Sequence, residues 1–297
     1  MRKAKLGARW YPGMSIPKRV RLFYFSGTGN TWWVTRRLVE VLKENGHLAE
    51  GYSIENLRTQ DAKDLIRDSD VVGFGYPVYG SDLPGTMKEF MASLPPISKD
   101  TFLYCTQWLW SGDGARVGTE FLHRSYKAKW AEHFFMPNNA SVSILRLPYT
   151  NDRNKIESIL QRAEWRIRSI AGRINAGKPF LRGFNRVAVF SGFIQRGPYR
   201  RMYAHLRDDI SVDSKRCTLC GQCVRLCPAE NLYQSEDLVR TRGKCILCLR
   251  CHNYCPEMAI AYMGKVPRKS LGVPYRGPVE GFDPAALRSG GESSVIR

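Results

Sequence analysis

Eight of the nine cysteines fall into two runs that share one spacing, C-x2-C-x2-C-x3-C-P. The runs consist of Cys217, Cys220, Cys223 and Cys227, and of Cys245, Cys248, Cys251 and Cys255. This spacing is typical of proteins that carry two [4Fe–4S] clusters, in which the fourth cysteine of each run ligates the other cluster. We therefore expect two ligand sets: Cys217, Cys220, Cys223 and Cys255 for cluster 1, and Cys245, Cys248, Cys251 and Cys227 for cluster 2.

Two other uses of these cysteines are possible in principle. Zinc usually takes two separated pairs of ligands, which fits two dense runs of four poorly. Disulfides need an oxidising compartment, and residues 1–20 lack the apolar segment of a signal peptide. The ninth cysteine, Cys105, lies in the apolar run 102–105, and we interpret it as a core thiol.

The chain has 297 residues, enough for two domains, and a formal net charge of +19. No apolar stretch reaches the roughly 18 residues that a membrane span requires, so we expect a cytoplasmic protein. Glu164 is the only acidic residue between positions 162 and 201, where basic residues are frequent. Such a region could attract an acidic protein, an anionic membrane or nucleic acid, or could simply be solvated. Because no nucleic-acid module accompanies it, we do not expect nucleic acid.

Strand-like and helix-like segments alternate over residues 18–175, which predicts an α/β doubly wound parallel sheet of five strands. The expected strands are 20–25, 47–54, 70–75, 101–106 and 130–136. The expected helices are 31–45, 61–68, 85–93, 114–126 and 152–173. Residues 1–17 form a basic arm. Residues 176–210 form a basic and aromatic bridge that either packs between two domains or lies on a membrane. A small α+β two-cluster domain spans 211–265, and an extended tail spans 266–297.

A glycine-rich loop follows the first expected strand and opens a helix. Its residues are Ser26, Gly27, Thr28, Gly29, Asn30 and Thr31. Backbone N–H groups, hydroxyls and the helix N-terminus can converge there on a phosphate. The loop matches neither GxxxxGK[ST] nor GxGxxG, so we expect the phosphomonoester of a small cofactor rather than a nucleoside triphosphate or dinucleotide. A tight turn without a ligand is the alternative.

Two further loops follow the third and fourth expected strands, at the sheet edge where doubly wound folds bind ligands. Tyr79 and either Trp108 or Trp110 could stack on a flat ring, although they could equally be core or interface residues. The candidate binding residues in these loops are Pro77, Val78, Tyr79, Gly80, Gln107, Trp108, Trp110, Gly112, Asp113 and Gly114.

These motifs carry a resemblance to known families. Residues 1–175, with the loop at 26–31, resemble a flavodoxin, and residues 217–255 resemble a bacterial two-cluster ferredoxin. The whole chain resembles the flavodoxin-fused ferredoxins found mainly in anaerobic bacteria and archaea, also at residues 210–213, 227–232, 268–269 and 275–278. The resemblance implies FMN, held by residues 26–31 and flanked by residues 76–82 and 107–114. The strong basic charge departs from ferredoxins of this type, which are usually acidic.

Together these features predict an electron-transfer iron–sulfur flavoprotein that relays low-potential electrons between FMN, two [4Fe–4S] clusters and a redox partner protein with an acidic surface. Two alternatives are a flavin-dependent reductase with its own small substrate and a nucleic-acid-associated redox sensor. His123 and His133 are candidate proton donors for the reductase, but we assign no catalytic residue. The sequence leaves open enzymatic activity, peripheral membrane contact and oligomeric state.

Overall fold

The computed structural model describes residues 16–139, 152–268, 272–288 and 295–297. Its central sheet has the strand order β11-β2-β1-β3-β4-β5-β6. The inner strands β1 to β5 run parallel to one another. Their bounds are Arg19–Tyr24, Leu48–Ser53, Val71–Pro77, Lys99–Gln107 and Tyr126–Phe135. The order 2-1-3-4-5 is that of flavodoxin-like folds, so the predicted fold class is confirmed.

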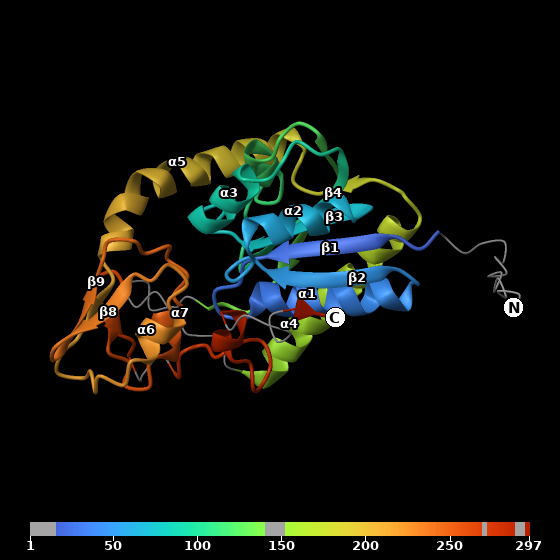
Figure 1. Cartoon of the computed structure of the whole chain (residues 1–297). Coiled ribbons are helices and arrows are strands. Elements are labelled where there is room, and N and C mark those ends of the chain that lie inside the picture. Colours follow the sequence, from blue (N-terminus) through green and yellow to red (C-terminus); the bar gives the residue numbers. More distant parts are fainter. Residues whose placement is uncertain (1–15, 140–151, 269–271, 289–294) are drawn as a thin grey trace, which may run out of the picture.

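Helices cover both faces of this sheet (Figure 1). Helices α1 (Asn30–Glu44) and α4 (Arg153–Asn175) pack on one face, around Leu22, Phe102 and Trp130. On the other face, α2 (Thr59–Arg67) and α3 (Gly85–Ala92) pack around Phe23 and Phe74. Both cores consist of apolar side chains that alternate along the strands, as a sheet buried on two faces requires. None of the described helices is long and apolar enough to cross a lipid bilayer.

One predicted helix, 114–126, is wrong. The chain instead forms a short 3-10 helix, η1 (Arg116–Phe121), and then enters β5 earlier than expected. The Tyr76 hydroxyl donates to the Ala115 carbonyl oxygen at 2.9 Å and lies against Gly118, where a Cβ would be 2.4 Å from it. This close packing on β3 ties the segment to the sheet and leaves no room for a regular α-helix.

Two short strands extend the predicted five-stranded sheet at its edges. In the bridge, β6 (Phe180–Leu181) pairs parallel with β5. In the tail, β11 (Val295–Ile296) pairs antiparallel with β2. The tail also contains a 3-10 helix, η3 (Pro284–Leu287), and it buries Phe282 and Leu287 against Tyr24 and Tyr254. It therefore differs from the extended segment expected, because its apolar side chains fill the junction between the two domains.

The small domain contains two antiparallel strand pairs and two short helices. The pairs are β7 (Ser211–Val212) with β10 (Ile260–Ala261), and β8 (Leu232–Ser235) with β9 (Leu238–Thr241). The helices α6 (Gln222–Leu226) and α7 (Arg250–Tyr254) each follow a cysteine loop. The domain is an α+β unit built on a duplication, as predicted.

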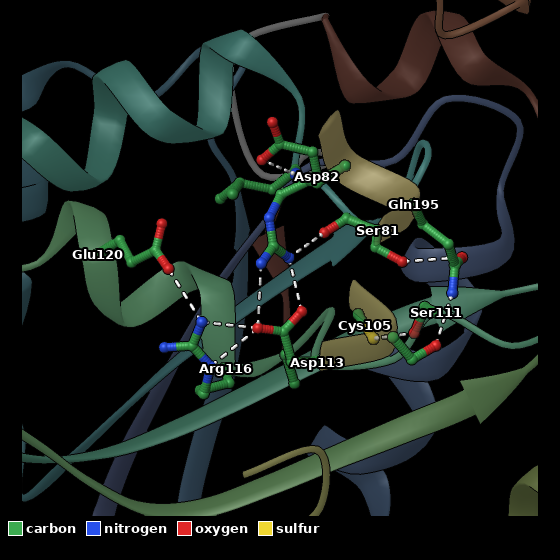
Figure 2. Close-up of polar contacts among 12 residues, drawn as sticks. Ser81, Asp82, Cys105, Ser111, Asp113, Arg116, Glu120 and Gln195 are labelled. Atoms are coloured by element: carbon green, nitrogen blue, oxygen red, sulfur yellow. Dashed lines mark hydrogen bonds and ion pairs between the residues drawn. The ribbon is translucent and has the colours of Figure 1, made fainter. Parts of the chain in front are cut away.

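The bridge is mainly one long helix, α5 (Arg186–Asp208), which runs from the flavodoxin-like domain to the small domain (Figure 1). Asn185 caps its N-terminus by accepting the N–H of Ala188 at 2.8 Å. Arg196 forms a buried ion pair with Asp113 at 2.6 Å (Figure 2), and Arg200 pairs with Asp82 at 2.7 Å. These contacts anchor α5 on the loops after β3 and β4.

Helix α5 lies close to these loops at Gly192. A Cβ there would lie 1.7 Å from Asp113 Oδ1. Replacing Gly192 with Ala should therefore displace α5 and lower the free energy of unfolding by about 1–3 kcal/mol. The control is Gly172→Ala in α4, where a Cβ meets nothing within 4 Å and a gain of about 0.5–1 kcal/mol is expected. Denaturant unfolding measures the change in unfolding free energy for both variants. Equal unfolding midpoints for Gly192→Ala and Gly172→Ala would contradict the close contact at Gly192.

His133 in β5 provides a pH-dependent term in stability. Its Nε2 accepts the backbone N–H of Ala115 at 3.3 Å, and burial, followed by Arg182, lowers its pKa to about 4. In the unfolded chain the pKa is near 6.5, so the unfolded state binds the proton first and stability falls as the pH drops from about 6.5 to about 4.

We expect this fall to reach up to about 3 kcal/mol, and His133→Gln should remove it. The measurement is the difference in unfolding free energy between the unmodified protein and the His133→Gln variant, taken once at pH 7 and once at pH 5. A difference that stays constant with pH would rule out this role for His133.

Candidate cofactor sites

The loop between β1 and α1 presents backbone N–H groups to an anion. Ser26 Oγ accepts the N–H of Trp32 at 3.1 Å, and Gly29 has a φ of 100° at the N-cap of α1. In the part of the chain that the structure describes, no group accepts a hydrogen bond from the N–H groups of residues 27–31. Free N–H groups at a helix N-terminus are the usual ligands of a phosphate.

A cavity of about 260 Å³ lies beside this loop. Its size is just below the roughly 300–1,000 Å³ typical of small-molecule sites. The predicted residues that line it are Ser26, Gly27, Thr28, Asn30, Thr31, Pro77, Val78, Tyr79, Gly80, Gln107 and Trp108. The Tyr79 hydroxyl in its wall is buried and has no hydrogen-bond partner among the described residues. A buried hydroxyl without a partner is costly, so this wall suits a ligand with polar groups.

Five predicted residues do not line this cavity. Gly29 faces Phe282 of the tail, 2.9 Å from where its Cβ would be. The others, Trp110, Gly112, Asp113 and Gly114, lie in the loop that receives α5. There the Trp110 indole N–H donates to Ser191 Oγ at 2.6 Å, and Asp113 pairs with Arg196 and Arg116 (Figure 2). These residues therefore form the surface against which α5 packs.

The cavity also contains residues that the sequence did not reveal. They are Thr106, Pro137, Asn138, Asn139, Tyr199, Leu247, Cys248, Leu249 and Tyr262. The first four lie at the carboxyl ends of β4 and β5, and the rule that predicted the other loops could have found them. The remaining five come from α5 and the small domain, and no local signal places them here.

The cysteines form two groups, each with three members from one run and one from the other. Cys217, Cys220, Cys223 and Cys255 line one small cavity. The pKa of Cys223 is raised to about 11, first by burial and then by the neighbouring Cys255 and Cys217. In the second group the pKa of Cys245 is raised to about 11 by burial and, to a smaller extent, by Cys227 of the other run. The structure thus brings together the members of both predicted ligand sets.

The two cysteine runs repeat the same unusual backbone. Leu219 and Leu247, at equivalent positions, both have a φ of 57°, and Glu230 and Met258 follow with 50° and 51°. These left-handed residues curl each loop so that backbone N–H groups point at sulfur: Asn231 donates to Cys227 Sγ and Ala259 to Cys255 Sγ, both at 3.2 Å. Hydrogen bonds to the sulfurs are one way in which proteins tune iron–sulfur potentials.

The cysteine groups do not form a site for a single metal ion. Among the described residues, no three Cys, His, Asp or Glu side chains gather closely enough to hold one metal ion. A cubane spreads its four thiolates over four iron atoms, so it needs a wider arrangement than tetrahedral zinc.

The second cysteine group adjoins the glycine-rich loop. Cys248 lines the same cavity, and its carbonyl oxygen lies 2.7 Å from where a Cβ of Gly27 would be. Only glycine permits this approach. The loop and the second cysteine run therefore form two walls of one site.

The fully buried guanidinium of Arg250 joins the two walls. It donates to the carbonyl oxygens of Ser26 at 2.7 Å and Gly27 at 2.9 Å, and pairs with Glu55 at 2.6 Å. In a trans peptide the C=O and the following N–H point in opposite directions. Holding these two carbonyls therefore turns the N–H groups of Gly27 and Thr28 away from Arg250, and these are two of the N–H groups that lack an acceptor.

The Arg250–Glu55 pair can be tested as a unit. Arg250→Met leaves Glu55 buried without its partner and should cost about 3–5 kcal/mol, whereas Arg250→Met with Glu55→Met should recover most of this. The control is Arg67→Met, which breaks an exposed pair with Asp64 and should cost less than about 1 kcal/mol. Denaturant unfolding is the measurement. A double variant no more stable than Arg250→Met would show that the two residues are not coupled.

One family model and several solved structures are similar to parts of this chain. Residues 209–256 match the family model of the 4Fe-4S dicluster domain. No curated protein matches the chain. The chain is similar to a solved flavodoxin from the domain Archaea, with 13% identity, 52% of this chain and 97% of that chain covered, and a TM-score of 0.37. It is also similar to the two-electron reduced flavodoxin of Megasphaera elsdenii, with 22% identity and a TM-score of 0.32. That match covers 41% of this chain and 90% of that chain.

A third similar structure is rubredoxin oxygen:oxidoreductase from Desulfovibrio gigas, with 18% identity and a TM-score of 0.40. The match covers 54% of this chain but only 36% of that protein. At these TM-scores the fold assignment rests on the strand order of the sheet. The chain therefore joins a flavodoxin-like α/β domain and a 4Fe-4S dicluster domain in one polypeptide.

Proposed function

We propose that this protein is an electron-transfer iron–sulfur flavoprotein that holds FMN beside one of two [4Fe–4S] clusters. The observation that carries the proposal is the shared cavity, in which the glycine-rich loop faces the loop around Cys248. FMN exchanges electrons singly or in pairs and a cluster exchanges them singly, so together they supply conversion between the two. The protein contributes the binding groups, their spacing and the exclusion of water.

The chain offers distinct groups for each part of FMN. The N–H groups of residues 27–31 and the hydroxyl of Thr28 would hold the phosphate. Tyr79, Trp108 and Tyr199 supply aromatic surface for the ring. Cys227, Cys245, Cys248 and Cys251 would hold the cluster next to this cavity.

The other cysteine group lies toward the surface. Its Cys220 is exposed and its Cys217 half-buried, with Cys223 and Cys255 buried, whereas the inner group has no exposed member and only Cys245 is half-buried. The two groups therefore stand in series between the solvent and the cavity, which supports exchange of electrons with a partner at the outer group.

We infer that this partner presents an acidic surface. An open groove next to the outer group is lined by Lys215, Lys265 and Arg268, together with Glu257 and the paired Arg216 and Asp213. No ion pair involves Lys215, Lys265 or Arg268 among the described residues. Unpaired cations at a rim accelerate encounter with an oppositely charged protein and make it sensitive to salt. A reducing, oxygen-poor cytoplasm suits such a protein, because its outer cluster would be exposed.

A reductase with its own substrate is less well supported. His123 is exposed and bonds Ser125 at 2.9 Å, and buried His133 bonds the backbone of Ala115. Neither lines the cavity, and its described lining contains no His, Asp, Glu or Lys. The proton donors left to such a reaction among the described lining residues are tyrosines and Cys248.

The test is anaerobic purification with iron, sulfide and flavin quantified, which should give about eight irons and one FMN per chain. In Cys227→Ala, alkylation should then reach Cys245, Cys248 and Cys251 while Cys217, Cys220 and Cys223 stay protected. Cys255→Ala is the matched variant and should expose the opposite set. Zinc in place of iron, or absence of flavin, would refute the proposal, and exposure of the same-run cysteines would refute the crossed ligation.

A further inference from the structure

The solvent-facing side of α5 is apolar along its first half. Phe190 and Phe193 are 66% and 70% exposed, and Val187 and Ile194 are exposed beside them. The opposite side of the same turns is buried through Ala188, Gly192 and Arg196. The outer side chains therefore serve neither the core nor the contact between the domains.

The loop after β4 continues this apolar surface. Trp110 is held against α5 by its hydrogen bond to Ser191, yet its ring is 59% exposed, and neighbouring Leu109 is exposed as well. We call the combined surface the α5 patch; it consists of Leu109, Trp110, Val187, Phe190, Phe193 and Ile194. Single exposed apolar residues are common on proteins, but a contiguous group marks a binding surface.

Positive charge flanks the α5 patch along its own helix. The sequence has no Asp or Glu between positions 165 and 207. Arg196 and Arg200 are bound to aspartates of the flavodoxin-like domain. Arg186 and Arg201 are exposed and form no ion pair with a described residue. The free charge on this side of the protein is therefore cationic.

The combination of exposed apolar side chains and free arginines favours one of the two possible binding partners of the α5 patch, a second copy of the chain or an anionic membrane. A second copy of the chain would bring the exposed Arg186 and Arg201 of one α5 against those of the other. The surface of an anionic bilayer matches both features, because its headgroups attract Arg and its acyl boundary accepts Phe, Ile and Val. Tryptophan also favours that interface. A helix of 23 residues is long enough to lie along it.

We propose that the α5 patch docks this protein onto the surface of an anionic membrane. Helix α5 lies in the plane of the interface with Phe190 and Phe193 inserted below the headgroups, and Arg186 and Arg201 contact lipid phosphates. The interaction is peripheral and reversible, and it weakens with salt. It is independent of the cofactors, so failure of the electron-transfer proposal would leave it standing.

The test is co-sedimentation of the full-length protein with vesicles of phosphatidylcholine alone or mixed with phosphatidylglycerol. Binding should require phosphatidylglycerol. Phe190→Ser with Phe193→Ser should weaken it by more than about tenfold, since each ring buries apolar surface. Arg186→Gln with Arg201→Gln should weaken it by about tenfold or more. The matched control is Leu48→Ser, which removes an exposed leucine from the start of β2 and should leave binding unchanged.

Three outcomes would overturn the proposal. They are absence of binding to anionic vesicles, equal binding by the double-Phe variant, and equal weakening by the Leu48 control. Sedimentation velocity without lipid tests the second-copy alternative. Self-association that the double-Phe variant abolishes, without vesicle binding, would assign the α5 patch to a dimer. Far-UV circular dichroism confirms folding of each variant, which we expect because the substituted side chains are exposed.

Discussion

The buried guanidinium of Arg250 is the interaction on which the two cofactor sites jointly depend. Its donors reach the carbonyl oxygens of Ser26 and Gly27, and its charge is matched by Glu55, whose pKa burial raises and Arg250 holds back from rising further. An arginine without this carboxylate would be an uncompensated charge in the core. One ion pair thus fixes the orientation of the loop peptides, and it does so from the helix that follows Cys248.

Local patterns in the sequence were sufficient to predict the five inner strands of the sheet and the grouping of the cysteines. The apolar runs of β1, β3 and β4 and the glycines of the loop act over a few residues, and the cysteine spacing carries its own rule for crossing between runs. The edge strands β6 and β11 were missed because two residues give no periodicity. Trp110 and Asp113 were placed in the cavity because their loop follows a strand, but contacts with α5, some 80 residues later, decide their orientation.

The positive charge of the chain shows why composition alone misleads about surfaces. Several arginines of the basic region form ion pairs within the protein: Arg196 with Asp113, Arg200 with Asp82, and Arg182 with Glu132. What remains free is set by geometry, and it includes cations beside the outer cysteine group and along α5 near its exposed phenylalanines. Only the structure separates charge that stabilises the fold from charge that is available to a partner.

The way the domains are joined bears on what the protein can do. A flexible linker would let the distance between two redox sites vary, and electron exchange would then wait for rare close encounters. Here α5 is anchored on the first domain and its Tyr203 hydroxyl donates to the Cys245 carbonyl oxygen at 3.2 Å in the second. The tail provides a second connection between the domains. The Tyr275 hydroxyl donates to Asn30 Oδ1 at 2.6 Å, and the backbone N–H of Tyr275 donates to Asn253 Oδ1 at 3.1 Å. Both connections end on residues beside the glycine-rich loop and the cysteine runs, so they fix the separation of the two sites. A fixed separation is what a one-electron relay requires.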